Sequence, residues 1–143
     1  LIHTLLQKQY DFVTLLIGVN NQYRNLSITE FDQEFTFLLL KALQYNGHQN
    51  SRVFVLSIPD WAHTPFAQNK ALETGINLTE ISAQIDAFNE VIKMRCEDME
   101  IELINITELT RNCAPEMIAQ DGLHYSANMH QIWAEKIAQK IKL

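Results

Sequence analysis

Glycine and proline are scarce in this chain of 143 residues, which contains four glycines and three prolines. They do not gather with serine into a linker, and no repeat or low-complexity tract interrupts the sequence. Hydrophobic residues make up 47% of the chain, which excludes a disordered or fibrous protein and is sufficient for a packed core. The sequence therefore predicts a single globular domain over residues 1–143.

The chain also lacks a basic cluster and a long apolar run. Its formal net charge is −6, and binding to a nucleic-acid backbone requires neutralised phosphates, so we expect no nucleic-acid partner. The longest apolar runs, residues 12–17 and 53–58, are far shorter than the roughly 20 residues of a membrane-spanning helix. Cys96 and Cys113 fit neither a metal-knuckle spacing nor a disulfide framework, so we expect two free thiols, with one disulfide as the alternative. The start at Leu1, without a signal-like segment, leaves the localisation open.

Three apolar runs predict buried β-strands, and helical periodicity follows each of them. The predicted strands span residues 11–17, 52–58 and 100–106. The predicted helices begin after Ser27, which has the capping-box spacing to Glu30, after Thr79 and after Ser126. This order favours right-handed crossovers and a parallel sheet with helices on both faces. The predicted fold class is α/β.

The predicted strand at residues 11–17 is too apolar to be an open edge of the sheet. Natural edge strands usually carry charges, prolines or bulges, and none of these occurs between Phe12 and Ile17. We therefore expect this strand to pair on both sides, although this chain supplies only one neighbour. The other neighbour is expected from sequence before Leu1 or from another polypeptide.

Polar and aromatic residues follow the carboxyl ends of all three predicted strands. They are Asn20 and Asn21 after the first, Asp60 and Trp61 after the second, and Asp121 and His124 after the third. Ligands of parallel α/β sheets bind in the crevice beyond these ends. We therefore expect the three loops to share one rim.

Two of these groups match parts of an acyl-transfer site, and each also has a structural interpretation. An amide such as that of Asn20 can stabilise an oxyanion, but Gly-x-Asn-Asn also suits a strand-to-helix turn. Asp121 lies three residues before His124 and could orient its imidazole as a general base and then a general acid. A surface loop that enters the last helix would show the same pattern.

The D-x-x-H spacing recurs at Asp60 and His63, where it could belong to two metal ligands. No third His or Cys follows at a ligand-like spacing. Pro59 and Pro65 instead indicate a rigid loop in which Trp61 presents an apolar wall to a substrate. We therefore predict no metal and no organic cofactor.

With these residues considered, the chain resembles the SGNH or GDSL-type hydrolases, serine esterases and acylhydrolases on a flavodoxin-like α/β/α sheet. DFVTLLIGVNNQYR is similar to the third block of the family, G-x-N-D, and DGLHYSANMHQIWAEKI is similar to its last block, D-x-x-H before a helix. The segment between them, VFVLSIPDWAHTPF, is similar to a bacterial subset of these enzymes. The resemblance implies that Asn20 stabilises the oxyanion, that Asp121 orients the base and that His124 is the base. Asn21 replaces the usual Asp, which we expect to alter loop hydrogen bonding.

The first block of the family, G-D-S with the nucleophilic serine, and the second block, with an oxyanion-hole glycine, have no match. All serines of the chain stand outside a Gly-Asp-Ser context; they are Ser27, Ser51, Ser57, Ser82 and Ser126. In this family both missing blocks precede the third. Their absence coincides with the missing neighbour of the strand at residues 11–17, so we expect an N-terminally incomplete domain.

The sequence thus predicts a hydrolase of small-molecule carboxylic esters that uses a Ser-His-Asp mechanism, with the serine outside this segment. Asn21, Tyr23 and Trp61 are the expected substrate contacts. The aromatic rings of Tyr23, Trp61 and Phe66 would suit a sugar ring or an acyl chain. Two alternatives stay open. One is a non-catalytic binding module that has lost its nucleophile. The other is a flavodoxin-like regulatory or nucleotide-binding domain, for which the chain lacks a phosphate-cradling glycine-rich loop and an acidic phospho-acceptor cluster.

Overall fold

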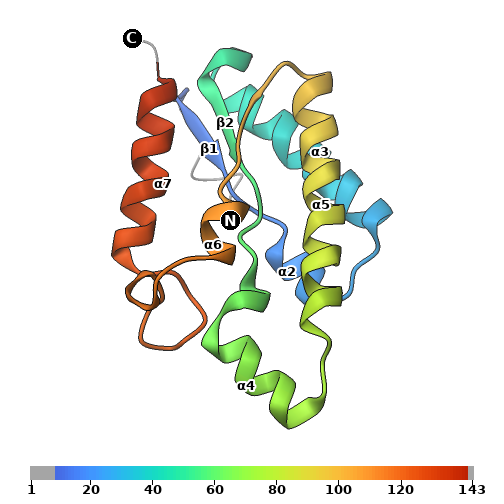
Figure 1. The fold of residues 1–143 in the computed structure, drawn as a ribbon. Coiled ribbons are helices and arrows are strands. Elements are labelled where there is room, and N and C mark those ends of the chain that lie inside the picture. Colours follow the sequence, from blue (N-terminus) through green and yellow to red (C-terminus); the bar gives the residue numbers. More distant parts are fainter. Residues whose placement is uncertain (1–8, 142–143) are drawn as a thin grey trace.

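A three-stranded parallel β-sheet lies between two layers of helices in the computed structural model, which describes residues 9–141 (Figure 1). The strands are β1 (Val13–Leu15), β2 (Val53–Leu56) and β3 (Glu102–Ile104). They lie in the order β1-β2-β3, and β2 pairs in parallel with both neighbours. The predicted α/β fold with a parallel sheet is confirmed. Residues 1–8 and 142–143 of the predicted domain lie outside the described residues.

Helices connect the strands and flank the sheet. They are α2 (Val19–Tyr23), α3 (Ile28–Tyr45), α4 (Pro65–Thr74), α5 (Leu78–Asp98), α6 (Thr107–Arg111) and α7 (Ala127–Lys140), with 3-10 turns at Asn50–Arg52, Trp61–His63 and Pro115–Met117. None of the helices within residues 9–141 has the length and apolar character needed to cross a membrane.

The three predicted helices are α3, α5 and α7, and their first turns differ in how they are capped. Ser27 and Glu30 form the predicted capping box at the start of α3. The prediction of Thr79 as a cap was wrong, because the side chain of Asn77 accepts hydrogen bonds from the backbone of Thr79 and Glu80. Ser126 precedes α7 as predicted, but its hydroxyl makes no capping bond. The short helices α2, α4 and α6 were not predicted from the sequence.

The two faces of the sheet have separate apolar cores. Along β2, Val53 and Val55 pack toward α3 and α5, whereas Phe54 and Leu56 pack toward α7. All four side chains are buried, as the alternation of side chains in a strand between two helical layers requires. Figure 1 shows α7 on one side of the strands and α5 on the other. Cys96 and Cys113 pack in different cores, and both thiols are free.

Strand β1 forms one edge of the sheet within the part of the chain that the structure describes. It pairs only with β2 there. Its alternate residues Val13 and Leu15 pack on the α3 side, but Leu16, just beyond the strand, is 40% exposed. The apolar strand thus has an open edge, and its expected second neighbour stays a prediction.

Gly18 joins β1 to α2. Its backbone conformation and its close neighbours both exclude a side chain at this position. Its φ of 114° lies outside the range that L-residues adopt readily. A Cβ atom at this position would lie 2.6 Å from the Cδ1 atom of Ile58 and 2.9 Å from the ring of Phe31. The core residues on the α3 side therefore require glycine at the turn that leads into Asn20.

We expect Gly18→Ala to lower the free energy of unfolding by about 2–5 kcal/mol, because strain and overpacking add. Gly75→Ala is the matched control: its φ of 73° is also positive, but no atom lies within 4 Å of the added Cβ. It should cost only about 1–2 kcal/mol. Urea unfolding of the two variants measures the difference, and equal losses would contradict the crowding at Gly18.

Candidate active site

The three loops at the carboxyl ends of the strands meet around a crevice of about 320 Å³. Its lining consists of Val19, Asn20, Tyr23, Pro59, Trp61, Leu123, His124 and Tyr125. Four predicted site residues, Asn20, Tyr23, Trp61 and His124, therefore line one crevice although they are distant in sequence. Figure 1 shows α2, α4 and the loop before α7 at the same end of the molecule.

Asp121 and His124 form a hydrogen-bonded pair at the mouth of this crevice. The Nδ1 atom of His124 lies 2.5 Å from Oδ2 of Asp121, while Oδ1 of the same carboxylate accepts the backbone N–H groups of Leu123 and His124, both at 2.9 Å. These bonds stabilise the ionised carboxylate, and the hydrogen bond from His124 contributes most to lowering the pKa of Asp121 to about 2.

This arrangement fixes which imidazole nitrogen is available. Because Nδ1 faces Asp121, Nε2 is the nitrogen left to exchange a proton, and it has no hydrogen-bond partner within residues 9–141. The side chain of His124 is 76% exposed. The pair can thus orient a base, but in this chain the base faces open space.

The loop that carries the pair is held by hydrogen bonds on both sides. Within the loop, the backbone N–H of Ala119 donates to the carbonyl of His124 at 2.7 Å. The first turn of α4 contributes the N–H of Phe66, which donates to the carbonyl of Gly122 at 3.0 Å. The hydroxyl of Tyr125 donates to the carbonyl of Asp60 at 3.1 Å. His124 is therefore exposed on an anchored backbone.

Asn20 and Asn21 stand in the first turn of α2, and their amides have different surroundings. Asn20 is exposed, lines the crevice and has no side-chain hydrogen bond within residues 9–141. Its amide is available to an oxygen in the crevice. The amide of Asn21 donates to the carboxylate of Glu34 on α3 at 2.7 Å, so Asn21 is not among the crevice residues.

The structure corrects the expected exposure of Trp61. Its side chain was predicted to present a flat wall to the substrate, but it is only 6% exposed and belongs to the core on the α3 side. The carboxylate of Asp60 caps the 3-10 turn that carries Trp61, and the indole N–H donates to the buried Gln22, so the ring packs inward. Tyr23, which is 48% exposed and meets the Trp61 ring edge-on at 5.5 Å, is the accessible aromatic side chain.

Asp60 and His63, the residues of the considered metal site, lie close together without forming a ligand set. Nε2 of His63 is 3.7 Å from the carboxylate of Asp60. The same carboxylate accepts a hydrogen bond from Nε of Arg111 at 2.9 Å, so the guanidinium group already balances the negative charge of Asp60. Within residues 9–141, no three His, Cys, Asp or Glu side chains gather as metal ligands would.

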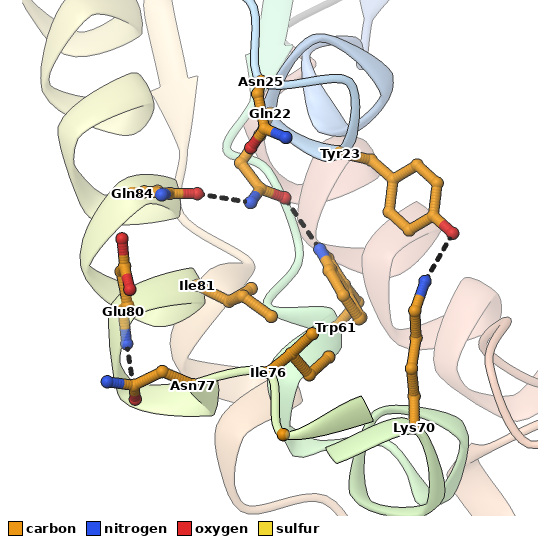
Figure 2. A pocket seen from close by; sticks show the side chains of 11 residues that line it. Gln22, Tyr23, Asn25, Trp61, Lys70, Ile76, Asn77, Glu80, Ile81 and Gln84 are labelled. Atoms are coloured by element: carbon orange, nitrogen blue, oxygen red, sulfur yellow. Dashed lines mark hydrogen bonds between the residues drawn. The ribbon is translucent and has the colours of Figure 1, made fainter. Parts of the chain in front are cut away.

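A second, polar pocket of about 570 Å³ adjoins the crevice and was not predicted from the sequence. Tyr23 and Trp61 line both hollows. Figure 2 shows the polar pocket, in which Gln22 links Trp61 to Gln84 on α5 and Tyr23 pairs with Lys70 on α4. Gln22 lies beside the G-x-N motif, but no local pattern indicates its partners, which are 39 and 62 residues away.

The chain is similar to lipases, acylhydrolases and esterases. A family model described as GDSL-like Lipase/Acylhydrolase family matches residues 2–132. Among solved structures, a lipase/acylhydrolase from Enterococcus faecalis shares 18% identity with a TM-score of 0.61, covering 92% of this chain and 60% of that one. The acetylxylan esterase Axe2 from Geobacillus stearothermophilus shares 15% identity with a TM-score of 0.66, covering 97% and 63%.

The same fold occurs in the OSK domain of Drosophila Oskar, with 13% identity and a TM-score of 0.55, covering 91% of this chain and 61% of that one. At these identities the likeness to solved structures concerns the fold. The chain spans about 60% of the length of these structures. No curated protein matches the sequence significantly.

The Asp121–His124 pair predicts a specific titration. In the folded protein we expect the Asp121 carboxyl group to titrate near pH 2, so the stability that it contributes is present above the unfolded pKa and is lost as the pH falls through the folded pKa. In His124→Ala the pKa should rise toward 3.8 but stay below it, because two backbone N–H groups still donate to the carboxylate.

Carbon-detected NMR of the Asp121 carboxyl group between pH 1.5 and 6 measures both values. His130→Ala is the matched control, since the imidazole of His130 contacts the backbone carbonyl of Ser126 and no carboxylate. A wild-type pKa no lower than that of His124→Ala would show that the pair does not form in solution.

Proposed function

This chain belongs to the GDSL-like lipase/acylhydrolase family, and we propose that it forms the base and oxyanion part of an active site that hydrolyses carboxylic esters. The observation that carries the proposal is the meeting of the Asp121–His124 pair with Asn20 in one crevice. Each motif alone also fits a turn or a surface loop. Their common position at the carboxyl ends of the strands is what a ligand site of a parallel sheet requires.

In the proposed reaction, a serine from outside this segment attacks the carbonyl carbon of the ester. Nε2 of His124 takes the serine proton, Asp121 stabilises the resulting imidazolium, and the amide of Asn20 donates to the oxyanion. Expulsion of the alcohol, which receives the proton from His124, leaves an acyl-enzyme. Water then attacks the acyl-enzyme with His124 again as base, and the carboxylic acid is released.

Two of the solved structures with this fold support the proposal. Axe2 is an acetylxylan esterase, and one structure is described as a catalytic mutant of Axe2 in which a histidine is replaced by alanine. A histidine is thus catalytic in an esterase of the same fold. We extend this role to His124 on the strength of its contact with Asp121.

A parallel strand on the open edge of β1 would place the missing nucleophile near the crevice. Its carboxyl end would lie at the same rim as Asn20, because parallel strands end at the same edge of a sheet. We propose that sequence before Leu1 or a second chain provides this strand and completes the domain.

The alternative is a binding module with this fold and no nucleophile. It is favoured by the crevice itself, because none of its lining residues is serine. The buried Ser57, which directly follows β2, is hydrogen-bonded to the hydroxyl and the backbone N–H of Thr107 on α6. Fold alone does not decide between the two functions. The intact mass of the native polypeptide does: a chain that starts at Leu1 and has no partner chain would contradict the catalytic proposal.

We expect the complete polypeptide to hydrolyse a short-chain aryl ester, and His124→Ala to lower kcat at least about a thousandfold, since His124 is the group proposed to take the serine proton. His130→Ala, on the exposed face of α7, should retain wild-type turnover. Steady-state kinetics with 4-nitrophenyl acetate measures both. Unchanged turnover in His124→Ala would remove this residue from the mechanism.

Asn20→Ala should lower kcat on the order of a hundredfold with little change in KM, because an oxyanion donor acts mainly in the transition state. Asn112→Ala, an exposed asparagine outside the crevice, serves as the matched control. If Asn20→Ala keeps the wild-type kcat, Asn20 is a turn residue of α2 and the oxyanion donor lies elsewhere.

A further inference from the structure

We propose that the polar pocket between α2, α4 and α5 binds the alcohol part of the ester, and that this part is a neutral carbohydrate. The pocket adjoins the crevice along Tyr23 and Trp61, which line both. The assignment rests on the proposed function, because it concerns the other side of the same ester bond. Its test measures binding, so that it can fail independently of hydrolysis.

The polar side chains of the pocket match hydroxyl groups. Six of them line it: Gln22, Asn25, Lys70, Asn77, Glu80 and Gln84. Four of the six are carboxamides. Both ends of the Gln22 amide are bonded within the protein, and the oxygen of Asn77 caps α5. The amide of Asn25 and the NH₂ groups of Asn77 and Gln84 have no partner within residues 9–141, so they can bind sugar hydroxyls. An acyl chain in this pocket would strip water from these groups without replacing their hydrogen bonds, which is unfavourable.

One side of the pocket is held in place by a relay of hydrogen bonds. Nε2 of Gln22 donates to Oε1 of Gln84 at 2.8 Å, and the indole N–H of Trp61 donates to Oε1 of Gln22 at 2.8 Å. Gln22 is 3% exposed, so both bonds are shielded from water. Gln84 uses only its oxygen, and its NH₂ group has no partner within residues 9–141. The relay thus leaves an oriented donor for a ligand.

The other side of the pocket is formed by an aromatic ring and a cation. Nζ of Lys70 donates to the hydroxyl of Tyr23 at 2.8 Å and lies 4.7 Å from the centre of its ring. Figure 2 shows Gln84 and Glu80 toward one side and Tyr23 with Lys70 toward the other. A fixed aromatic ring beside oriented amides is the combination that suits a sugar, whose C–H face is apolar and whose rim is polar.

The charge of the pocket favours a neutral ligand. Lys70 contributes the single positive charge of the lining, and Glu80 contributes the single negative charge. A phosphorylated or carboxylated ligand would find one cation, which already binds Tyr23, and one repelling carboxylate. A carbohydrate carries no charge that needs a partner.

The crevice beside His124 has the opposite character, which separates the two parts of an ester. Around the catalytic pair its walls include Val19, Pro59 and Leu123. These side chains suit an acyl group, and the crevice volume of about 320 Å³ suits a short one. With the acyl group there, the alcohol would extend past Tyr23 into the polar pocket.

The test is an NMR titration of the ¹⁵N-labelled complete polypeptide with xylotriose, cellotriose and maltotriose, each up to 50 mM. We expect at least one trisaccharide to shift the indole N–H resonance of Trp61 and the side-chain amides of Gln22 and Gln84 saturably. Hexanoate is the probe for the acyl side. It should shift the resonances of Leu123 and leave the side-chain amide resonance of Gln84 unchanged. Absence of a saturable shift with all three sugars would overturn the assignment. A shift of the Gln84 amide resonance by hexanoate would overturn it as well.

Variants locate the binding. Gln84→Leu should weaken the affinity at least tenfold, whereas Gln139→Leu, the same change on the exposed face of α7, should keep it. Gln84→Leu also leaves the Nε2 donor of the buried Gln22 without its partner. Lys70→Met, which changes a half-buried side chain on the opposite side of the pocket, is therefore the second variant and should weaken binding several-fold. Wild-type affinity in both pocket variants would exclude this pocket.

The two proposals have different signatures. Hydrolysis of an aryl ester without any sugar binding would overturn the carbohydrate subsite alone. Saturable sugar binding without hydrolysis would support the subsite and leave the chain as a carbohydrate-binding module, which contradicts the catalytic proposal.

Discussion

The rim of the sheet depends on the buried carboxylate of Asp60. Its side chain is fully buried and accepts hydrogen bonds from Nε of Arg111 and the backbone of Ala62. Its backbone N–H donates to the hydroxyl of Thr110, and its carbonyl accepts the hydroxyl of Tyr125. A buried charge without such partners costs several kcal/mol. The end of β2, α6 and the loop before α7 are therefore joined at one residue.

This junction sets the place of the Asp121–His124 pair. Tyr125 directly follows His124, and burial raises the pKa of its hydroxyl, which keeps the proton that the bond to Asp60 requires. On the other side, the first turn of α4 binds the carbonyl of Gly122. The backbone of the loop is thus anchored at both ends while the imidazole stays exposed. An anchored backbone with an accessible side chain is what positions a base for a reacting group from another segment.

The fold and the contact between Asp121 and His124 were predictable because their signals are local. Buried parallel strands have nearly continuous apolar runs, and Asp121 and His124 are close in sequence. The features that were missed are non-local. Whether Trp61 faces a substrate or the core depends on Gln22, 39 residues away, and the polar pocket depends on α4, which has little apolar periodicity to reveal it.

The caps illustrate the same limit at short range. Asn77 and Thr79 are both good caps, and the sequence pattern of α5 fits either start within two residues. The structure selects Asn77 because its carboxamide reaches two N–H groups at once. Boundaries of elements are decided by such small differences, whereas the order of elements is decided by the whole apolar pattern.

Two features of the chain would be explained by the one further strand proposed beside β1. The apolar β1 has an open edge within the described residues, and His124 faces outward with Nε2 free of partners there. A single parallel strand beside β1 would cover the edge and bring its carboxyl end to the rim that holds Asn20. The requirement for the strand comes from hydrophobic burial, and the requirement for a nucleophile comes from acyl-transfer chemistry. Because these two requirements are physically independent, their agreement on one position is the strongest argument that the crevice is one part of a larger active site.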